Sequence, residues 1–265
     1  MAFSDAEDAE LLAATVRTAG ATALGHFRGS LEVFRKADGS AVSSGDLATD
    51  AVLVETLGAA RPAYGIMSEE RADAIALGTR TFVIDPIDGT NAYIKNAADW
   101  SVVAAVIEDG RPVAAAVYEP VSDTLFVAAR GGGALRDDKP IAVADAEMPR
   151  ASVAMPMALF KRAFKGTPTK KGPYLTSLAL RLTRVADGRF DGLVTRGGSH
   201  HWDLAAGDLI VQEAGGTLLG LDGHPPRYDT DDTRHPPIVA GPKGMVDALL
   251  PAVRRATAKP PSGET

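Results

Sequence analysis

Hydrophobic positions near the N-terminus recur at the spacing of an α-helix, with polar residues between them. Two such stripes occur in the first sixty residues, and each is typical of a helix with one buried face. The first stripe predicts a helix over about 5–28 that ends near Gly29, and the second predicts a helix over 44–60. The positions of the first stripe are Leu11, Leu12, Val16, Ala19, Ala23, Leu24 and Phe27.

The middle of the chain changes to short β-branched and apolar runs. A run at 64–67 leads into Glu69 and Glu70, and a buried strand at 81–84 is expected to stop at Asp85. Three more runs are separated by turn signals and predict an antiparallel meander. Three consecutive glycines follow the last of these runs and open no helix, so we interpret them as a hairpin turn. The three runs cover 100–108, 111–118 and 123–129, and the glycines are 131–133.

Beyond Pro149 the pattern alternates between strand and helix. Helices are expected over 175–186, 202–214 and 243–252, with strands at 192–195, 217–219 and 238–240. The chain shows neither an internal repeat nor an obvious linker. We therefore predict one folded unit over 1–254, with an N-terminal lobe over about 1–150 and a C-terminal lobe over about 151–254. The proline-rich residues 255–265 are expected to form a disordered tail.

Composition excludes several classes of function. The 265 residues include no cysteine, which rules out disulfides and thiolate catalysis. There are 28 basic and 34 acidic residues, and a net charge of −6 makes broad electrostatic binding of nucleic acid an unexpected function. The acidic N-terminus lacks the pattern of a secretory signal, and the apolar runs are too short to span a membrane. We expect a cytoplasmic protein.

The sequence Asp85-Pro86-Ile87-Asp88-Gly89-Thr90 carries the clearest chemistry. A hydrophobic strand delivers two carboxylates three residues apart, and the proline stiffens the turn. Gly89 permits close approach of the backbone, and a short helix is expected to start at Thr90. Backbone N–H groups at a helix start bind anions. Two acids beside an anion site indicate bound cations, and oxygen ligands favour Mg²⁺.

Two further acidic positions lie at the ends of predicted elements. Glu69 and Glu70 follow a strand, and Asp203 lies where a helix begins. Each has an ordinary interpretation, because Asp203 could stabilise a helix dipole and the glutamates could be a solvated pair. Three acidic positions in otherwise apolar settings favour a shared metal site.

These motifs resemble the inositol monophosphatase superfamily. The resemblance extends over residues 8–250 and rests on four segments in order. They are the loop from Lys36 to Asp46, Ser68-Glu69-Glu70, residues 85–90, and Trp202-Asp203-Leu204-Ala205-Ala206 followed by Glu213-Ala214-Gly215-Gly216. The chain departs from the family pattern at Ser68, Ala41 and Ser43, and the acids are retained. The resemblance implies an αβαβα layered sandwich, of mixed α/β and α+β type, with metals at the seam between the lobes.

The resemblance also implies roles for individual residues. Glu69, Asp85 and the Ile87 carbonyl would hold one Mg²⁺, and Asp85, Asp88 and Asp203 a second, with a third, weaker ion near Glu69. Asp46 and Thr90 would orient the attacking water, and Glu69 would share in catalysis. The substrate phosphate would meet Asp88, Gly89, Thr90 and Asp203. Two cations about 3.5–4 Å apart can clamp both the attacking and the leaving oxygen of a phosphoryl transfer.

The identity of the alcohol depends on weaker signals. Inositol-specific members resemble one another in a glutamate seven residues before the second-metal aspartate, where this chain has Arg196. Basic residues at 161–171 could be a solvated loop, but together with Arg196 they favour a substrate of higher charge. The stretch from Ser177 to Gly188 resembles bacterial 3′(2′),5′-bisphosphate nucleotidases, and Ser177 is a candidate substrate contact. We therefore lean towards a bisphosphorylated nucleotide such as 3′-phosphoadenosine 5′-phosphate.

Several alternatives remain open on sequence alone. Inositol 1-phosphate fits the sequence nearly as well as the bisphosphorylated nucleotide. Phosphatases for histidinol phosphate and for fructose 1,6-bisphosphate belong to the same superfamily. A different class is a regulatory partner of RNA or the transcription machinery with little catalysis, which the retained acids and the net charge disfavour. The resemblance also implies lithium sensitivity and a homodimer.

Overall fold

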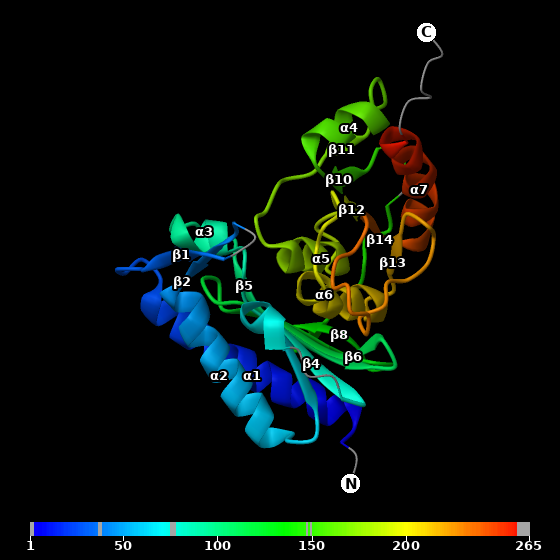
Figure 1. The fold of residues 1–265 in the computed structure, drawn as a ribbon. Coiled ribbons are helices and arrows are strands. Elements are labelled where there is room, and N and C mark those ends of the chain that lie inside the picture. Colours follow the sequence, from blue (N-terminus) through cyan, green and yellow to red (C-terminus); the bar gives the residue numbers. More distant parts are fainter. Residues whose placement is uncertain (1–2, 37–38, 75–77, 147, 149, 259–265) are drawn as a thin grey trace.

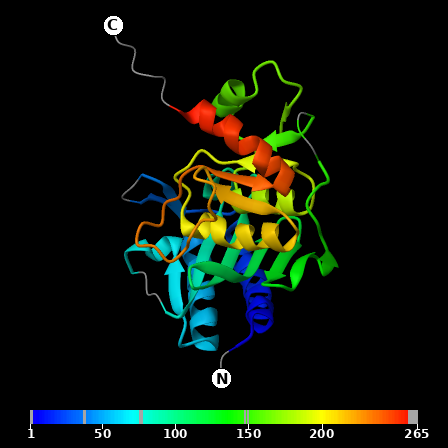
Figure 2. The ribbon, with the colours of Figure 1, turned by 90° about the vertical axis from the view of Figure 1, so that its right-hand side faces the viewer.

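The computed structural model has five layers, in which helices and two β-sheets alternate. It describes residues 3–36, 39–74, 78–146, 148 and 150–258. Two N-terminal helices cover a large sheet, two helices lie between that sheet and a smaller one, and two C-terminal helices cover the smaller sheet (Figures 1 and 2). The predicted αβαβα sandwich is confirmed.

The helices occupy three of these layers. The first layer holds α1 (Asp5–His26) and α2 (Ser44–Ala60), and the central layer holds α5 (Leu178–Ala186) and α6 (His201–Glu213). The outer C-terminal layer holds α4 (Met157–Ala163) and α7 (Lys243–Thr257). Two further short elements are the 3₁₀ helix η1 (Glu69–Ala74), which contacts two strands of the large sheet, and the helix α3 (Thr90–Ile94), which contacts the strand Ala41–Ser43.

The large sheet has seven strands in chain order, and only its first pair is parallel. It contains β3 (Gly65–Ser68), β4 (Arg80–Asp88), β5 (Ser101–Glu108), β6 (Arg111–Glu119), β7 (Thr124–Ala129), β8 (Gly133–Arg136) and β9 (Lys139–Pro140). Strands β5, β6 and β7 pair antiparallel, which confirms the predicted meander. Residues 130–132 connect β7 to its antiparallel neighbour β8, which begins at Gly133, so the three glycines lie in the expected hairpin turn.

The smaller sheet joins strands that are far apart in the sequence. Its order is β11 (Lys170–Lys171), β10 (Ser152–Ala154), β12 (Gly192–Val194), β14 (Ile238–Gly241) and β13 (Thr217–Gly220). A separate hairpin is formed by β1 (Val33–Arg35) and β2 (Ala41–Ser43). The alternation of strand and helix predicted beyond Pro149 is confirmed, although α4, β10 and β11 were not predicted individually.

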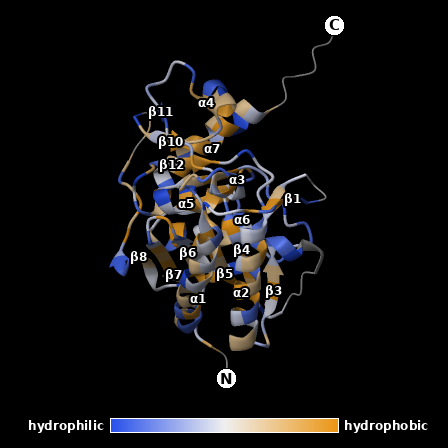
Figure 3. Cartoon of the chain, turned by 90° about the vertical axis from the view of Figure 1, so that its left-hand side faces the viewer, coloured by the Kyte–Doolittle hydropathy of each residue, from blue (hydrophilic) through white to orange (hydrophobic). Residues whose placement is uncertain are grey.

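Alternation along the central strands separates two hydrophobic cores. On β4, Phe82 and Ile84 pack with α1 and α2, whereas Val83 packs with α5 and α6. Successive side chains of a strand point to opposite faces, so each strand contributes to both cores. Figure 3 shows the hydrophobic residues gathered on the strands behind α1 and α2. A third core joins the smaller sheet to α4 and α7.

Two boundary predictions were wrong. Strand β4 does not stop at Asp85 but continues to Asp88, because a shift in the pairing with β5 accommodates the residues between the two aspartates. Helix α7 extends through Thr257, so residues 255–257 are not a disordered tail. Buried residues Val253 and Ala256 continue the apolar face of α7, which explains the extension. Residues 259–265 lie outside the described part of the chain. Among the described residues, no helix is both long and apolar enough to cross a membrane.

Candidate metal and active site

The pairing of β3 with β4 brings Glu69 beside Asp85. These strands are parallel, and Ser68 pairs with Ile84. The residues that follow this pair are Glu69, the first residue of η1, and Asp85, the next residue of β4. Asp85 lies on the same face of β4 as Val83, which is the face towards α6. The strand register thus directs Asp85 into the seam between the two lobes.

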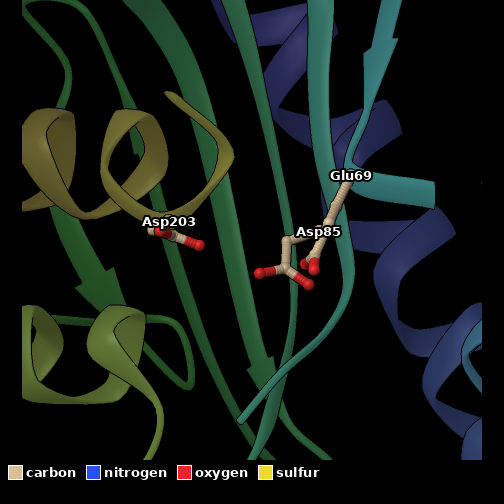
Figure 4. A group of neighbouring side chains, drawn as sticks. All are labelled: Glu69, Asp85 and Asp203. Carbon is tan, nitrogen blue, oxygen red and sulfur yellow. The ribbon is translucent and has the colours of Figure 1, made fainter. Parts of the chain in front are cut away.

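Helix α6 supplies the third carboxylate from the opposite side of this seam. Figure 4 shows Asp203, at the start of α6, facing Asp85 and Glu69. Glu69, Asp85 and Asp203 each offer a carboxylate oxygen, and these atoms all lie within 4.8 Å of one another. Asp203 also accepts a hydrogen bond from the His200 backbone N–H at 2.7 Å, so it caps the helix as well. Its capping role and its place in the acidic cluster coexist.

Asp88 is held behind this cluster by the start of α5. Its Oδ2 accepts hydrogen bonds from Ser177 Oγ and from the Ala179 backbone N–H, both at 2.6 Å. Ser177 is itself fully buried and caps α5. Direct contact of Ser177 with substrate, as predicted from the sequence, does not fit this placement. Its hydroxyl orients Asp88 instead.

Asp46 and Thr90 meet at the N-terminal end of α2. Thr90 Oγ1 lies 3.1 Å from Asp46 Oδ1 and 3.0 Å from the Ile87 carbonyl oxygen, so its single proton can be donated to either. Ser43 Oγ donates to the other Asp46 oxygen at 2.6 Å. The structure therefore brings Asp46 and Thr90, which were predicted to orient the attacking water, next to the Ile87 carbonyl, which was predicted to hold one metal.

Gly89 is required by the turn between Asp88 and α3. Its φ of +97° is the left-handed conformation that glycine adopts without strain. A Cβ at this position would also lie 2.9 Å from the Asp99 carbonyl oxygen. Glycine therefore lets the backbone before Thr90 pass close to its neighbours.

The carboxylates of the cluster repel one another in a buried setting. Burial raises the pKa of Asp85 well above its ordinary value, and the charges of Glu69, Asp88 and Asp203 raise it further. The pKa of Asp203 is raised well above its ordinary value by burial and by Asp88. Burial also raises the pKa of Asp88, against the hydrogen bonds that it accepts. A bound cation would remove this penalty.

Lys36 balances part of the negative charge at the edge of the cluster. Its Nζ lies 2.7 Å from Glu69 Oε1 and 3.0 Å from Glu70 Oε1. Burial raises the pKa of Glu70 to about 7, against the charge of Lys36. Burial acts to lower the pKa of Lys36, but the charges and hydrogen bonds of Glu69 and Glu70 together outweigh it, so the Lys36 pKa is raised.

Sequence reasoning missed Asp50, which supports the strand end that carries Glu69. Ser68 Oγ donates to Asp50 Oδ1 at 2.5 Å, and Arg71 Nε donates to Asp50 Oδ2 at 2.7 Å. These donors lie on either side of Glu69 and Glu70 in the chain. The only signal for Asp50 in the sequence was its position four residues after Asp46, which places both acids on the same face of α2.

The site fits Mg²⁺ by the chemistry of its donors. The clustered groups are carboxylates, with one backbone carbonyl beside them, and hard oxygen ligands of this kind suit Mg²⁺. Raised pKa values in a group of buried acids are also expected where a cation normally balances their charge. Glu69, Asp85, Asp88, Asp203 and the Ile87 carbonyl are the residues that would hold it.

A cavity of about 1020 Å³ opens beside Asp88 and Asp203. Arg196 lines it, as do Arg162 and Lys171 from the basic segment 161–171, which is therefore more than a solvated loop. Sequence reasoning missed a fourth cation in the cavity, Arg181 on α5. It follows Ser177 by one helical turn, and that spacing was the signal that could have placed it next to Asp88.

The fold and the acidic cluster define a class of metal-dependent phosphatase-like proteins, and comparison with known proteins identifies the family. The model of the inositol monophosphatase family matches residues 5–258. The chain belongs to this family, and it is a phosphoric monoester hydrolase.

Similar proteins of known name, and similar solved structures, agree with this assignment. An inositol-1-monophosphatase of Mesorhizobium japonicum is 32% identical over 238 residues, which cover 85% of this chain and 87% of the relative. The Nus factor SuhB of Xylella fastidiosa is 32% identical over 260 residues, with 90% and 91% covered. The extragenic suppressor protein suhB of Bartonella henselae superposes with a TM-score of 0.82 at 26% identity, covering 92% of this chain and 97% of that one. An IMPase of Thermotoga maritima gives a TM-score of 0.81 at 25% identity, with 94% and 96% covered.

Proposed function

We propose that this protein is a Mg²⁺-dependent phosphatase that hydrolyses a small phosphate monoester by attack of water. The observation that carries the proposal is the meeting of Glu69, Asp85 and Asp203 at the seam between the lobes, with oxygens within 4.8 Å of one another. When bound there, Mg²⁺ would neutralise phosphate charge and supply an activated water. No covalent intermediate with the protein is required.

The protein's own residues position the reactants. Asp46 and Thr90 form a hydrogen-bonded pair that can accept a proton from water and fix its direction. The backbone N–H groups of Gly89 and Thr90, at the start of α3, would bind a phosphate oxygen. Ser177 and Ala179 hold Asp88 in one orientation, which keeps its second oxygen available to a cation.

Inositol phosphates are the substrates that the comparisons support best. Relatives that cover most of the chain are named inositol-1-monophosphatase, and those reported above include no bisphosphate nucleotidase. The substrate favoured by the sequence, 3′-phosphoadenosine 5′-phosphate, is therefore the second candidate. The observation in its favour is the set of cations in the cavity, to which Arg196 belongs.

A regulatory role is the alternative from another class. Relatives named Nus factor SuhB are as similar to this chain as the inositol-1-monophosphatases. A variant without metal binding would separate such a role from catalysis, because a binding surface elsewhere on the protein would survive the change. The homodimer, the third ion and lithium sensitivity stay predictions from the family.

Phosphate release from inositol 1-phosphate, with Mg²⁺ and after chelation, tests the proposed function. We expect turnover only with Mg²⁺, and loss of turnover in Asp203→Asn with the fold retained. Glu55→Gln, which changes an exposed acid on α2, is the matched control and should behave as wild type. Undiminished turnover after thorough chelation, or in Asp203→Asn, would contradict the proposal.

A further inference from the structure

The cavity beside the acidic cluster gathers four cations from four different parts of the C-terminal lobe. Arg162 comes from α4, Lys171 from β11, Arg181 from α5, and Arg196 from the segment after β12. Figures 1 and 2 show α4 on the side of α5 that faces away from the large sheet. The chain as a whole is acidic, with a net charge of −6, so this concentration of positive charge is local.

These four cations lack carboxylate partners among the described residues, unlike most arginines of this chain. Arg61, Arg80 and Arg184, for example, each form ion pairs with acids. In the part of the chain that the structure describes, Arg181 donates to the backbone carbonyls of Ser177 and Thr176, with its Nε 3.3 Å from the Ser177 oxygen. Lys171 Nζ likewise donates to the Gly172 carbonyl at 3.1 Å. Backbone carbonyls fix the position of a cation but leave its charge uncompensated.

Asp88 and Asp203 are the carboxylates that act on the charge of Arg181. Burial lowers the pKa of Arg181, while Asp88 and Asp203 raise it and Arg196 lowers it. Metal ions bound by Asp88 and Asp203 would neutralise these two carboxylates, which would then no longer balance the charge of Arg181. The loaded site would then present a positively charged cavity, which requires an anion to balance it.

We propose that this cavity binds a second phosphate of the substrate, while the scissile phosphate lies at the acidic cluster. The proposal rests on the proposed phosphatase function and adds to it a preference for bisphosphorylated esters. A phosphate offers several acceptor oxygens and up to two charges, which matches a group of arginine and lysine donors better than a hydroxyl does. The cavity, at about 1020 Å³, has room for an ester larger than a single phosphate and its ring.

Two alcohol scaffolds share this chemistry, a cyclitol and a nucleoside, and matched pairs of substrates distinguish them. With saturating Mg²⁺, kcat/KM is measured for inositol 1-phosphate against inositol 1,4-bisphosphate, and for adenosine 3′-monophosphate against 3′-phosphoadenosine 5′-phosphate. We expect the wild-type protein to prefer the bisphosphate by about tenfold or more in at least one pair. The pair that shows the preference identifies the scaffold.

Single substitutions then test the residues themselves. Arg162→Ala and Arg196→Ala should each lower the bisphosphate-to-monophosphate ratio of kcat/KM by roughly tenfold. Lys161→Ala removes the neighbouring exposed cation of α4, which does not line the cavity, and should leave the ratio unchanged. Arg162, Arg196 and Lys161 are all exposed, so these variants should fold. A fall of the wild-type ratio with rising KCl is an independent measure that needs no variant.

The outcomes separate this inference from the proposed function. Hydrolysis of monophosphates without preference in either pair would overturn the second-phosphate site and leave the phosphatase intact. A preference that survives both arginine substitutions would also overturn it. Absence of hydrolysis with every substrate would contradict the proposed function itself.

Discussion

The Nζ of Lys36 lies 2.7 Å from Oε1 of Glu69, one of the carboxylates of the acidic cluster. The same ammonium group lies 3.0 Å from Glu70. An internal cation therefore holds an acid that a metal would also use, at the position where the β1–β2 hairpin approaches the start of η1. Lys36 lowers the cost of clustering these acids in the absence of metal, and it competes with metal for their charge.

Replacing Lys36 by methionine should therefore strengthen Mg²⁺ binding. We expect the Mg²⁺ concentration that gives half-maximal activity to fall several-fold, because a positive charge close to the metal site is removed. Titration of phosphate release with Mg²⁺ measures the change, and Lys139→Met on the exposed strand β9 is the control. An unchanged or higher Mg²⁺ requirement would show that Lys36 assists binding instead of opposing it.

Asp85→Asn should separate stability from activity. Asp85 is buried among Glu69, Asp88 and Asp203, and its charge is unfavourable without a cation. The metal-free variant should melt at a higher temperature than the metal-free wild type, by about 2–4 °C for each kcal/mol of repulsion removed. Turnover should be lost, and Mg²⁺ should no longer raise Tm. Asparagine can keep the hydrogen bond that Asp85 Oδ1 accepts from the Ile87 N–H.

Scanning calorimetry with and without Mg²⁺ checks this expectation, with Glu55→Gln as the exposed control. A lower Tm for metal-free Asp85→Asn would mean that the acid stabilises the fold by contacts other than those described above.

Ser177→Ala should weaken the metal site without removing any ligand. The substitution deletes the 2.6 Å hydrogen bond to Asp88 Oδ2 and leaves the bond from the Ala179 N–H. Loss of such an orienting partner typically costs roughly 10- to 100-fold in metal affinity or activity. Mg²⁺ dependence of kcat/KM gives the measurement, and Ser177→Thr should restore much of the function.

Ser101→Ala is the graded control for this variant, because Ser101 Oγ contacts Ser177 Oγ at 3.0 Å but is one step further from Asp88. It should have a smaller effect. Equal effects of both substitutions would indicate a general packing defect.

His235 should make the protein less stable in acid. Burial, together with the charge of nearby His201, lowers its pKa from 6.5 to about 4. The unfolded chain therefore binds more protons than the folded one between these values, and stability should fall as pH drops from 6.5 to 4. His201 Nε2 lies 3.2 Å from the Thr230 carbonyl oxygen, to which it donates, so its Nδ1 accepts from His235 Nε2 at 2.8 Å. Protonation of His201 Nδ1 would break that bond.

The free energy of unfolding, measured by denaturant at several pH values, tests this expectation. His235→Gln should flatten the dependence between pH 4 and 6.5, whereas His224→Gln, at an exposed position, should not. An equally steep curve for His235→Gln would assign the acid sensitivity to other groups.

Local patterns in the sequence were enough to predict most elements and to single out the acids that cluster in the fold. The stripes that predicted α1 and α2 reflect burial of one helix face, because a buried residue recurs at every turn of each helix. The acids at 69, 85, 88 and 203 were recognisable because carboxylates are costly beside apolar runs. The end of β4 was misplaced because a shift in strand pairing has no clear signature in one strand alone.

Tertiary structure alone decided what these residues do together. The parallel register of β3 and β4 sets Glu69 beside Asp85, and α6 brings Asp203 across the seam. Ser177 was predicted to touch substrate, but its burial behind Asp88 follows from how α5 packs. The four cations of the cavity come from separate elements, so no spacing in the chain predicts their meeting. Periodicity records which face of an element is buried, whereas contacts between distant elements depend on how those faces pack against one another.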